Sequence, residues 1–203
     1  MTTVADLVDL FEAEAARDRT SEETPDVGVV MGSDSDLDVM AGAHDALTDL
    51  GFTEVTDYDD APSGYSFESW VVSAHRTPDL MYAYAETAAD RGLDVVIAGA
   101  GGKSADLPNM TASLAYPLPV IGVPVQEKSV DSVIGMPTGA PLTAVDAGKS
   151  YNAGLSAAQF LATDDPDLAD RLRDLHAERR DGVADVSAAL HDRGTERFRA
   201  DRD

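Results

Sequence analysis

The chain has 203 residues, of which 43% are apolar, so it is long enough to form one globular domain with a sizeable core. It contains no cysteine, which excludes disulfides, thiolate metal sites and a cysteine nucleophile. Its 15 lysine and arginine residues against 38 aspartate and glutamate residues give a formal net charge of −23. This charge repels polyanions, so we expect neither nucleic acid nor an anionic membrane as a partner.

The charged residues are also unusual in kind. The acids comprise 28 Asp and 10 Glu, and the bases comprise 12 Arg and 3 Lys. This composition indicates a halophilic protein, because the Debye length falls to about 3 Å at 1 M salt and surface repulsion is then screened. An ordinary acidic protein, kept soluble by its charge, is the alternative. Residues 1–19 are acidic and amphipathic, unlike a secretion signal, so we expect a cytoplasmic protein.

Both ends of the chain have the apolar spacing of amphipathic helices. The apolar positions are Val4, Leu7, Val8 and Phe11 near the start, and Leu168, Leu172, Leu175, Val183, Val186 and Leu190 in the tail. We therefore divide the chain into an N-terminal helical extension (1–25), a catalytic α/β domain (26–162) and a C-terminal helical extension (163–203). The apolar stripes of the extensions must be covered, either by neighbouring subunits or by their own subunit.

Between the extensions, short apolar runs alternate with helical periods. The runs are bounded by Gly, Pro or Ser, as is typical of buried parallel strands, and they cover residues 27–31, 70–72, 93–98, 120–123 and 142–145. Helices are expected from Leu37 to Leu50, before Gly51, and from an N-cap at Thr77 to Gly92. This order predicts an α/β fold, a three-layer open parallel sheet with ligands outside the carboxyl ends of its strands.

Two features suggest other classes of protein but do not fit them. Residues 107–126 are uncharged, yet four prolines would interrupt a membrane-spanning helix, so this stretch is expected in a soluble core. Gly102-Lys103-Ser104 is similar to the end of a nucleotide-triphosphate loop. That motif needs a glycine where this chain has Ile97, so the assignment fails.

Three polar turns follow the predicted strands. The first, residues 32–36, combines a glycine with Ser33, Ser35 and Asp36 and suits an anionic group, although a plain helix cap is the alternative. The second contains Ser73, His75 and Arg76. His75 is the one histidine expected at a strand's carboxyl end, where it can exchange protons, and Arg76 offers a forked donor to a phosphate. The alternative for His75 is a structural histidine in a tight turn.

The third turn, residues 99–104, is rich in glycine. Gly101 and Gly102 would let the backbone approach a ligand closely, and Lys103 is a candidate contact for an anion. The alternative is a loop whose glycines only satisfy unusual dihedral angles.

Together these segments resemble one family, the carboxyaminoimidazole ribonucleotide mutases and aminoimidazole ribonucleotide carboxylases of purine synthesis. The matching segments are residues 30–36, 72–79 and 98–102, followed by 107–108, 119–125, 136–137 and 152–155. The resemblance implies a flavodoxin-like fold, a homo-octamer, a phosphorylated ribosyl imidazole as substrate, and neither metal nor redox cofactor.

The resemblance also implies roles for individual residues. Ser33 and Asp36 match substrate-binding positions, Arg76 matches a phosphate-contacting arginine, and His75 matches the general acid/base. In the mutase, a carbamate on the exocyclic amine loses carbon dioxide, which the neighbouring ring carbon captures. His75 would move the proton that this carbon loses. The remaining candidates for substrate binding share these turns: Ser35, Ser73, Gly101, Gly102 and Lys103.

The chain departs from the mutase pattern in three places. The third loop, Gly101 to Met110, is one residue longer than the family's and has no histidine, so Asp106 is not assigned that histidine's role. Its Lys103-Ser104 pair is similar to the Arg-Ser of the carboxylases, whereas Arg76 follows the mutases. Residues 56–66 are longer than the family pattern and predict an acidic surface loop. Residues 141–152 are intermediate in length between the two branches.

The mutase is our first interpretation. The runner-up is a direct carboxylase that uses free carbon dioxide. A non-catalytic nucleotide-binding module, which would use the same turns to hold a phosphorylated ligand, is the alternative from another class.

Overall fold

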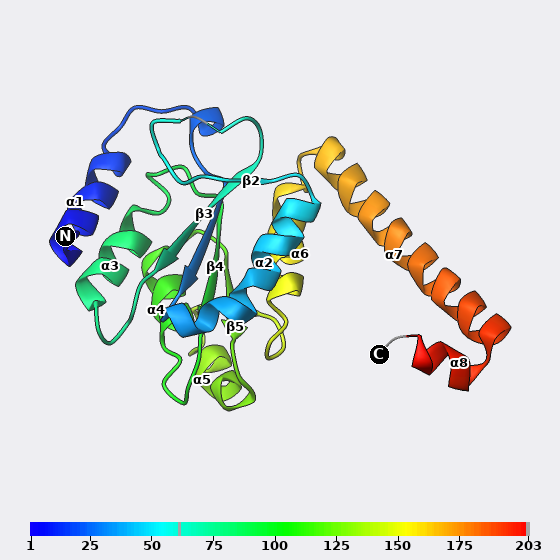
Figure 1. The fold of residues 1–203 in the computed structure, drawn as a ribbon. Helices are drawn as coiled ribbons and strands as arrows, with labels where there is room; N and C mark the ends of the chain where they lie inside the picture. Colours follow the sequence, from blue (N-terminus) through cyan, green and yellow to red (C-terminus); the bar gives the residue numbers. More distant parts are fainter. Residues whose placement is uncertain (61, 202–203) are drawn as a thin grey trace.

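The structure is a computed structural model that describes residues 1–60 and 62–201 (Figure 1). Its centre is a six-stranded sheet in the order β2-β3-β1-β4-β5-β6, and every neighbouring pair of strands is parallel. The strands are β1 (Val27–Met31), β2 (Thr53–Glu54), β3 (Ser66–Val71), β4 (Val95–Ala100), β5 (Val120–Pro124) and β6 (Thr143–Ala144). The predicted three-layer, flavodoxin-like α/β fold is confirmed.

Helices cover both faces of this sheet (Figure 1). One face carries α1 (Val4–Ala15), α3 (Pro78–Thr87) and α4 (Leu107–Leu114), and the other carries α2 (Leu37–Asp49) and α6 (Ser150–Leu161). The remaining helical elements are η1 (Ser21–Glu23), η2 (Asp34–Asp36), η3 (Glu127–Ser129), α5 (Val130–Ile134), α7 (Pro166–Arg193) and α8 (Thr195–Ala200). The layers explain the continuous apolar runs, since a parallel strand is buried on both faces.

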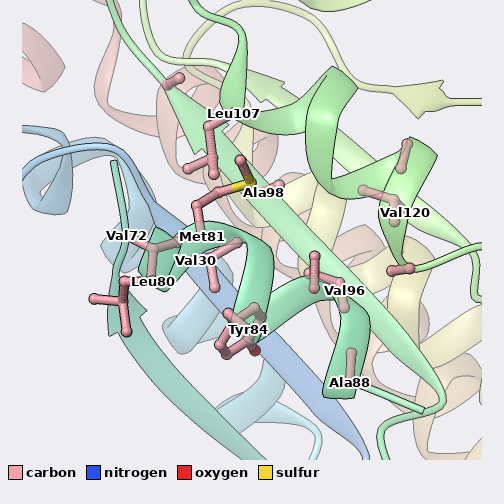
Figure 2. Close-up of a cluster of buried hydrophobic side chains, with 14 of the residues drawn as sticks. Val30, Val72, Leu80, Met81, Tyr84, Ala88, Val96, Ala98, Leu107 and Val120 are labelled. Atoms are coloured by element: carbon pink, nitrogen blue, oxygen red, sulfur yellow. The ribbon is translucent and has the colours of Figure 1, made fainter. Parts of the chain in front are cut away.

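Alternate residues of β1 enter two different cores. Val29 packs in the cluster beneath α2 and α6, whereas Val30 packs in the cluster beneath α3 and α4. Figure 2 shows this second cluster, with Met81 and Tyr84 of α3 lying over Val30 and Val96. The sheet is therefore anchored on both sides, which fixes the positions of the turns at its carboxyl edge.

The strand boundaries correct several of the sequence-based predictions. β3 begins at Ser66 rather than residue 70, because Ser66 and Glu68 are buried despite being polar. β4 covers Val95–Ala100 rather than 93–98, since pairing with β5 continues to Ala100. β5 extends one residue beyond the prediction, β6 is shorter than predicted, and the short, exposed β2 was not predicted. The predicted surface loop lies between β2 and β3, and its residues 56–60 and 62–65 form neither helix nor strand.

The N-terminal helix packs on its own subunit. The Phe11 ring is fully buried and meets Trp70 and Tyr84 edge-on, at centroid distances of 5.0 and 5.3 Å. Thr3 and Asp6 form a capping box at its start. At α3, Thr77 takes the predicted N-cap position, but its hydroxyl accepts a hydrogen bond from the Ser73 backbone N–H (3.0 Å) instead of capping the helix.

The C-terminal helix α7 packs on the subunit through its first half, as far as Arg179, whose guanidinium lies 4.2 Å from the centroid of the Tyr151 ring. Leu168 is fully buried, and Leu172 packs against the same cluster. Farther along, Val183 and Val186 are 70% and 54% exposed, where the helix has left the body of the subunit (Figure 1). The first predicted stripe is thus covered within the subunit, whereas the second is bare in the single chain.

Within residues 107–126, α4 and β5 bury Leu107, Ala112 and Ile121, so this stretch is part of the core, as predicted. Among the described residues, no helix combines the length and the apolar character that a membrane crossing requires.

Candidate functional site

A pocket of about 350 Å³ opens at the carboxyl ends of β1, β3, β4 and β5. β2 and β3 lie on one side of β1, and β4, β5 and β6 lie on the other. The direction in which the chain adds strands to the sheet therefore reverses at β1. Open α/β sheets bind ligands at this kind of switch point. The three polar turns chosen from the sequence all contribute to the wall of this pocket.

The first turn contributes Ser33, Ser35 and Asp36. Ser33 is the N-cap of η2, and its hydroxyl accepts a hydrogen bond from the Ser35 backbone N–H at 3.4 Å, so the capping alternative describes part of its role. Asp36 is only 7% exposed, and this burial raises the pKa of its carboxyl. Backbone N–H groups of Ser33 and Gly101 and the charge of Arg76 act in the opposite direction.

The second turn holds Arg76 against the first. Its Nη2 donates to the Gly32 carbonyl at 2.8 Å, and its Nε donates to the Ser73 hydroxyl at 3.4 Å. Ser73 also accepts from the Arg76 backbone N–H. These bonds orient the guanidinium, and its remaining donors can bind an anion in the pocket.

His75 lies open in the same pocket, with its side chain 60% exposed. This exposure argues against a structural histidine inside a packed turn. Its Nε2 is 3.1 Å from Oδ2 of Asp106, and the other carboxylate oxygen of Asp106 accepts a hydrogen bond from the Ser132 hydroxyl at 3.2 Å. Asp106 was not among the predicted site residues, because it lies 31 positions from His75 and only the fold brings them together.

The third turn lines the pocket with Gly101 and Gly102. A Cβ at Gly101 would lie 3.0 Å from Oδ1 of Asp36, so a side chain there would have to displace the Asp36 carboxylate by a few tenths of an ångström. Gly102 has φ +87°, in the left-handed region that favours glycine. The dihedral angle of Gly102 fits the conformational alternative, whereas close approach of this loop to a ligand stays a prediction.

The cations of the pocket differ from the predicted set. Lys103 is exposed and is not among the described residues that line the pocket, whereas Lys128 in η3 is. Ser104 and Gln126 also line it and were not predicted. The signal that could have identified Lys128 and Gln126 was their position just beyond the predicted strand 120–123, at the same edge of the sheet.

The pocket therefore presents two cations, Arg76 and Lys128, and two carboxylates, Asp36 and Asp106. Within residues 1–60 and 62–201, no group of three or more His, Asp or Glu side chains is placed to hold a metal ion. The arrangement suits a ligand that joins a phosphate to a polar ring, with one imidazole beside it for proton transfer.

Comparisons with known proteins agree with this fold. The chain is 47% identical over 173 residues to the N5-carboxyaminoimidazole ribonucleotide mutase of Mycobacterium tuberculosis H37Rv, covering 82% of this chain and 88% of that protein. It is 44% identical over 174 residues to the enzyme of the same name from Bacillus subtilis 168, covering 82% and 98%. The crystal structure of Treponema denticola PurE superimposes with a TM-score of 0.65 at 22% identity, over 82% of this chain and 98% of that one.

The family model described as AIR carboxylase matches residues 26–181, which include all six strands and every turn that lines the pocket. With this match and relatives that align over most of their own length, the chain belongs to the AIR carboxylase family.

Proposed function

We propose that this protein is an N5-carboxyaminoimidazole ribonucleotide mutase of purine synthesis. It would convert the N5-carboxylated ribonucleotide to 4-carboxy-5-aminoimidazole ribonucleotide. The observation that carries the proposal is the pairing of His75 and Arg76 on one turn, with both side chains in a pocket walled by glycine backbone. The mutases among its relatives support the same reaction.

In this proposal the phosphate binds at the first two turns. Arg76 and Lys128 supply charge, and the hydroxyls of Ser33, Ser35 and Ser73 supply hydrogen bonds. The heterocycle would lie on the backbone of Gly101 and Gly102, near Asp36, and Lys103 remains a candidate contact at the rim. A ligand held at both ends in this way has its ring fixed beside His75.

The reaction then needs two bonds broken and two formed: carbon dioxide moves from the exocyclic nitrogen to the ring carbon, and a proton moves from that carbon to the nitrogen. The bond between the carbamate carbon and the exocyclic nitrogen breaks, and the ring carbon attacks the released carbon dioxide. His75 takes the proton that this ring carbon loses, and the exocyclic nitrogen regains a proton, so the conversion is an isomerisation. A single well-placed general acid/base contributes about 10² to 10⁴ in rate. The rest would come from positioning the carbon dioxide beside the ring carbon and from stabilising the charge that develops.

The runner-up is the direct carboxylase, which would use aminoimidazole ribonucleotide and free carbon dioxide. The Lys103-Ser104 pair favours it, whereas Arg76 favours the mutase. The two are separated by incubating the pure protein with the carbamate substrate and, separately, with aminoimidazole ribonucleotide and bicarbonate. Turnover of the carbamate at low bicarbonate supports the mutase, and product formed only from bicarbonate would replace it with the carboxylase.

We further propose a homo-octamer in a salt-rich cytoplasm, with residues 26–162 as the catalytic domain between two helical extensions. The bare stripe of α7 (Val183, Val186 and Leu190) supports an assembly, because such faces are usually covered. Sedimentation of the full chain at low and at molar salt tests both the octamer and the adaptation to salt. A particle of eight chains that is retained or strengthened at high salt is expected, and a monomer at every salt concentration would refute the octamer.

A further inference from the structure

The third loop of the pocket carries a carboxylate that touches the proposed acid/base. We propose that Asp106 is a positioning residue, which holds the His75 ring in the orientation needed for proton transfer. This inference rests on the proposed function, because it assigns Asp106 a part in the same reaction.

The Asp106 carboxylate is held between two elements. One oxygen, Oδ2, lies 3.1 Å from Nε2 of His75, and the other, Oδ1, accepts the Ser132 hydroxyl of α5 at 3.2 Å. The side-chain amide of Asn109 in α4 donates to the Ser132 carbonyl at 2.6 Å, which ties the starts of the two helices together. Asp106 itself is the residue that precedes α4. The carboxylate therefore approaches His75 from a fixed direction.

This contact assigns different tasks to the two ring nitrogens. In the neutral imidazole one nitrogen carries a proton and the other accepts one. With a carboxylate beside Nε2, that nitrogen is the proton carrier, and Nδ1 of His75 is left to accept the proton from the substrate's ring carbon. When the C–H bond breaks, its electron pair returns to the ring and the proton forms a bond to Nδ1. The Asp106 charge then stabilises the imidazolium, as a carboxylate does in a catalytic triad.

The pair contributes little to the stability of the fold. The His75 and Asp106 side chains are 60% and 42% exposed, and exposed ion pairs are weak. Its effect is therefore expected in catalysis, where a displacement of about 1 Å can cost about 10²-fold in rate.

The first test measures steady-state kinetics of the full-length protein with the carbamate substrate. Asp106→Ala should lower kcat by about tenfold to hundredfold, with KM and the dissociation constant of the product unchanged within about twofold. Asp106→Asn should retain part of the rate, because its amide oxygen can still accept a hydrogen bond from Nε2 of His75. Asp131→Asn in α5 is the matched control, since it removes an equal charge from an exposed position beside Ser132 and should leave kcat unchanged.

The second test asks whether Asp106 acts through His75. In a His75→Asn background, Asp106→Asn should lower the residual rate by less than about twofold, because the ring that it positions is gone. An equal loss in both backgrounds, or an unchanged kcat in Asp106→Ala, would overturn the inference. If the Asp106 variants fail to fold, Ser132→Ala decides: a several-fold drop in kcat supports the inference and an unchanged kcat refutes it.

These outcomes are distinct from a failure of the proposed function. A wild-type enzyme that does not turn over the carbamate refutes the mutase reaction itself. If that enzyme instead uses bicarbonate, the same pair of variants tests Asp106 in the carboxylase reaction, because His75 would remove the same proton.

Discussion

The carboxylate of Glu68 and the guanidinium of Arg91 form an ion pair inside the core, 2.6 Å apart, with each side chain 1% exposed. The Arg91 guanidinium also lies over the rings of Phe11 and Tyr84, at 4.8 and 4.6 Å from their centroids. The Tyr58 hydroxyl donates to the same carboxylate. One charged pair thus connects α1, α3, β3 and the loop before β3.

Removing one member of this pair should destabilise the protein strongly. In Glu68→Gln the guanidinium of Arg91 stays buried without the carboxylate that it contacts, so we expect the free energy of unfolding to fall by about 3–5 kcal/mol. Urea unfolding at fixed protein concentration measures the change. The control is Asp170→Asn, which breaks the exposed pair with Arg173 and should have a far smaller effect. Equal losses in both variants would show that burial does not increase the contribution of the Glu68–Arg91 pair to the free energy of unfolding.

Two glycine substitutions should change stability in opposite directions. Gly154 lies where α6 crosses α2, and a Cβ there would be 2.7 Å from the Ala46 Cβ and 2.8 Å from the Ala43 carbonyl oxygen. Gly154→Ala should therefore cost about 1–3 kcal/mol through overpacking.

Gly182 is the matched position, in the exposed part of α7, where a Cβ would meet nothing within 4 Å. Gly182→Ala should stabilise the helix by about 1 kcal/mol, since alanine has the higher helix propensity. Thermal unfolding of both variants tests the pair of predictions. If both substitutions lower the melting temperature, Gly182 is in contact with something outside the single chain.

His75→Asn tests the general acid/base. The variant should bind the substrate with an unchanged dissociation constant, yet turn it over at least about 10²-fold more slowly, because asparagine cannot relay the proton. Calorimetric binding and steady-state assays give the two quantities. His191→Asn, on the exposed surface of α7, is the control and should leave turnover intact. If the protein is instead a non-catalytic binding module, the unmodified protein will show no turnover.

Two lysines of the site region can be compared directly. Lys128→Met should raise KM for the phosphorylated substrate about tenfold, which corresponds to about 1.4 kcal/mol of binding. Lys103→Met should change KM less, because Lys103 does not line the pocket in the part of the chain that the structure describes. Initial rates over a range of substrate concentrations measure both. A larger effect at Lys103 would favour the sequence-based assignment over the geometric one.

The fold could be predicted from the sequence because most of the buried strands are continuous runs of apolar residues. The run from Val27 to Met31 is buried on both faces, so its pattern needed no knowledge of its neighbours. β3 was misplaced because Glu68 interrupts its apolar pattern, and the partner that allows this burial, Arg91, is 23 residues away. The two-residue β2 has exposed, polar side chains and gave no periodic signal.

For the site too, the sequence analysis found the residues that lie in local patterns and missed others. His75 and Arg76 were found because they follow a predicted strand and lie in a recognisable segment. Asp106 and Lys128 were not, because their places in the pocket depend on how α4 and η3 lie after β4 and β5. The position of Lys128 just beyond a predicted strand was a signal that the sequence analysis did not use, whereas the contact of Asp106 with His75 is visible only in the assembled sheet.

The register of the sheet has a consequence for how such proteins can diverge. Met31 at the end of β1 is paired with both Val71 and Gly99, so the spacing between the three polar turns is set by backbone hydrogen bonds within the sheet. The long connection before β3 enters at the opposite edge. We therefore expect insertions in that connection to change turnover little, whereas an insertion between Gly101 and Asp106 should move the Asp106 carboxylate away from His75.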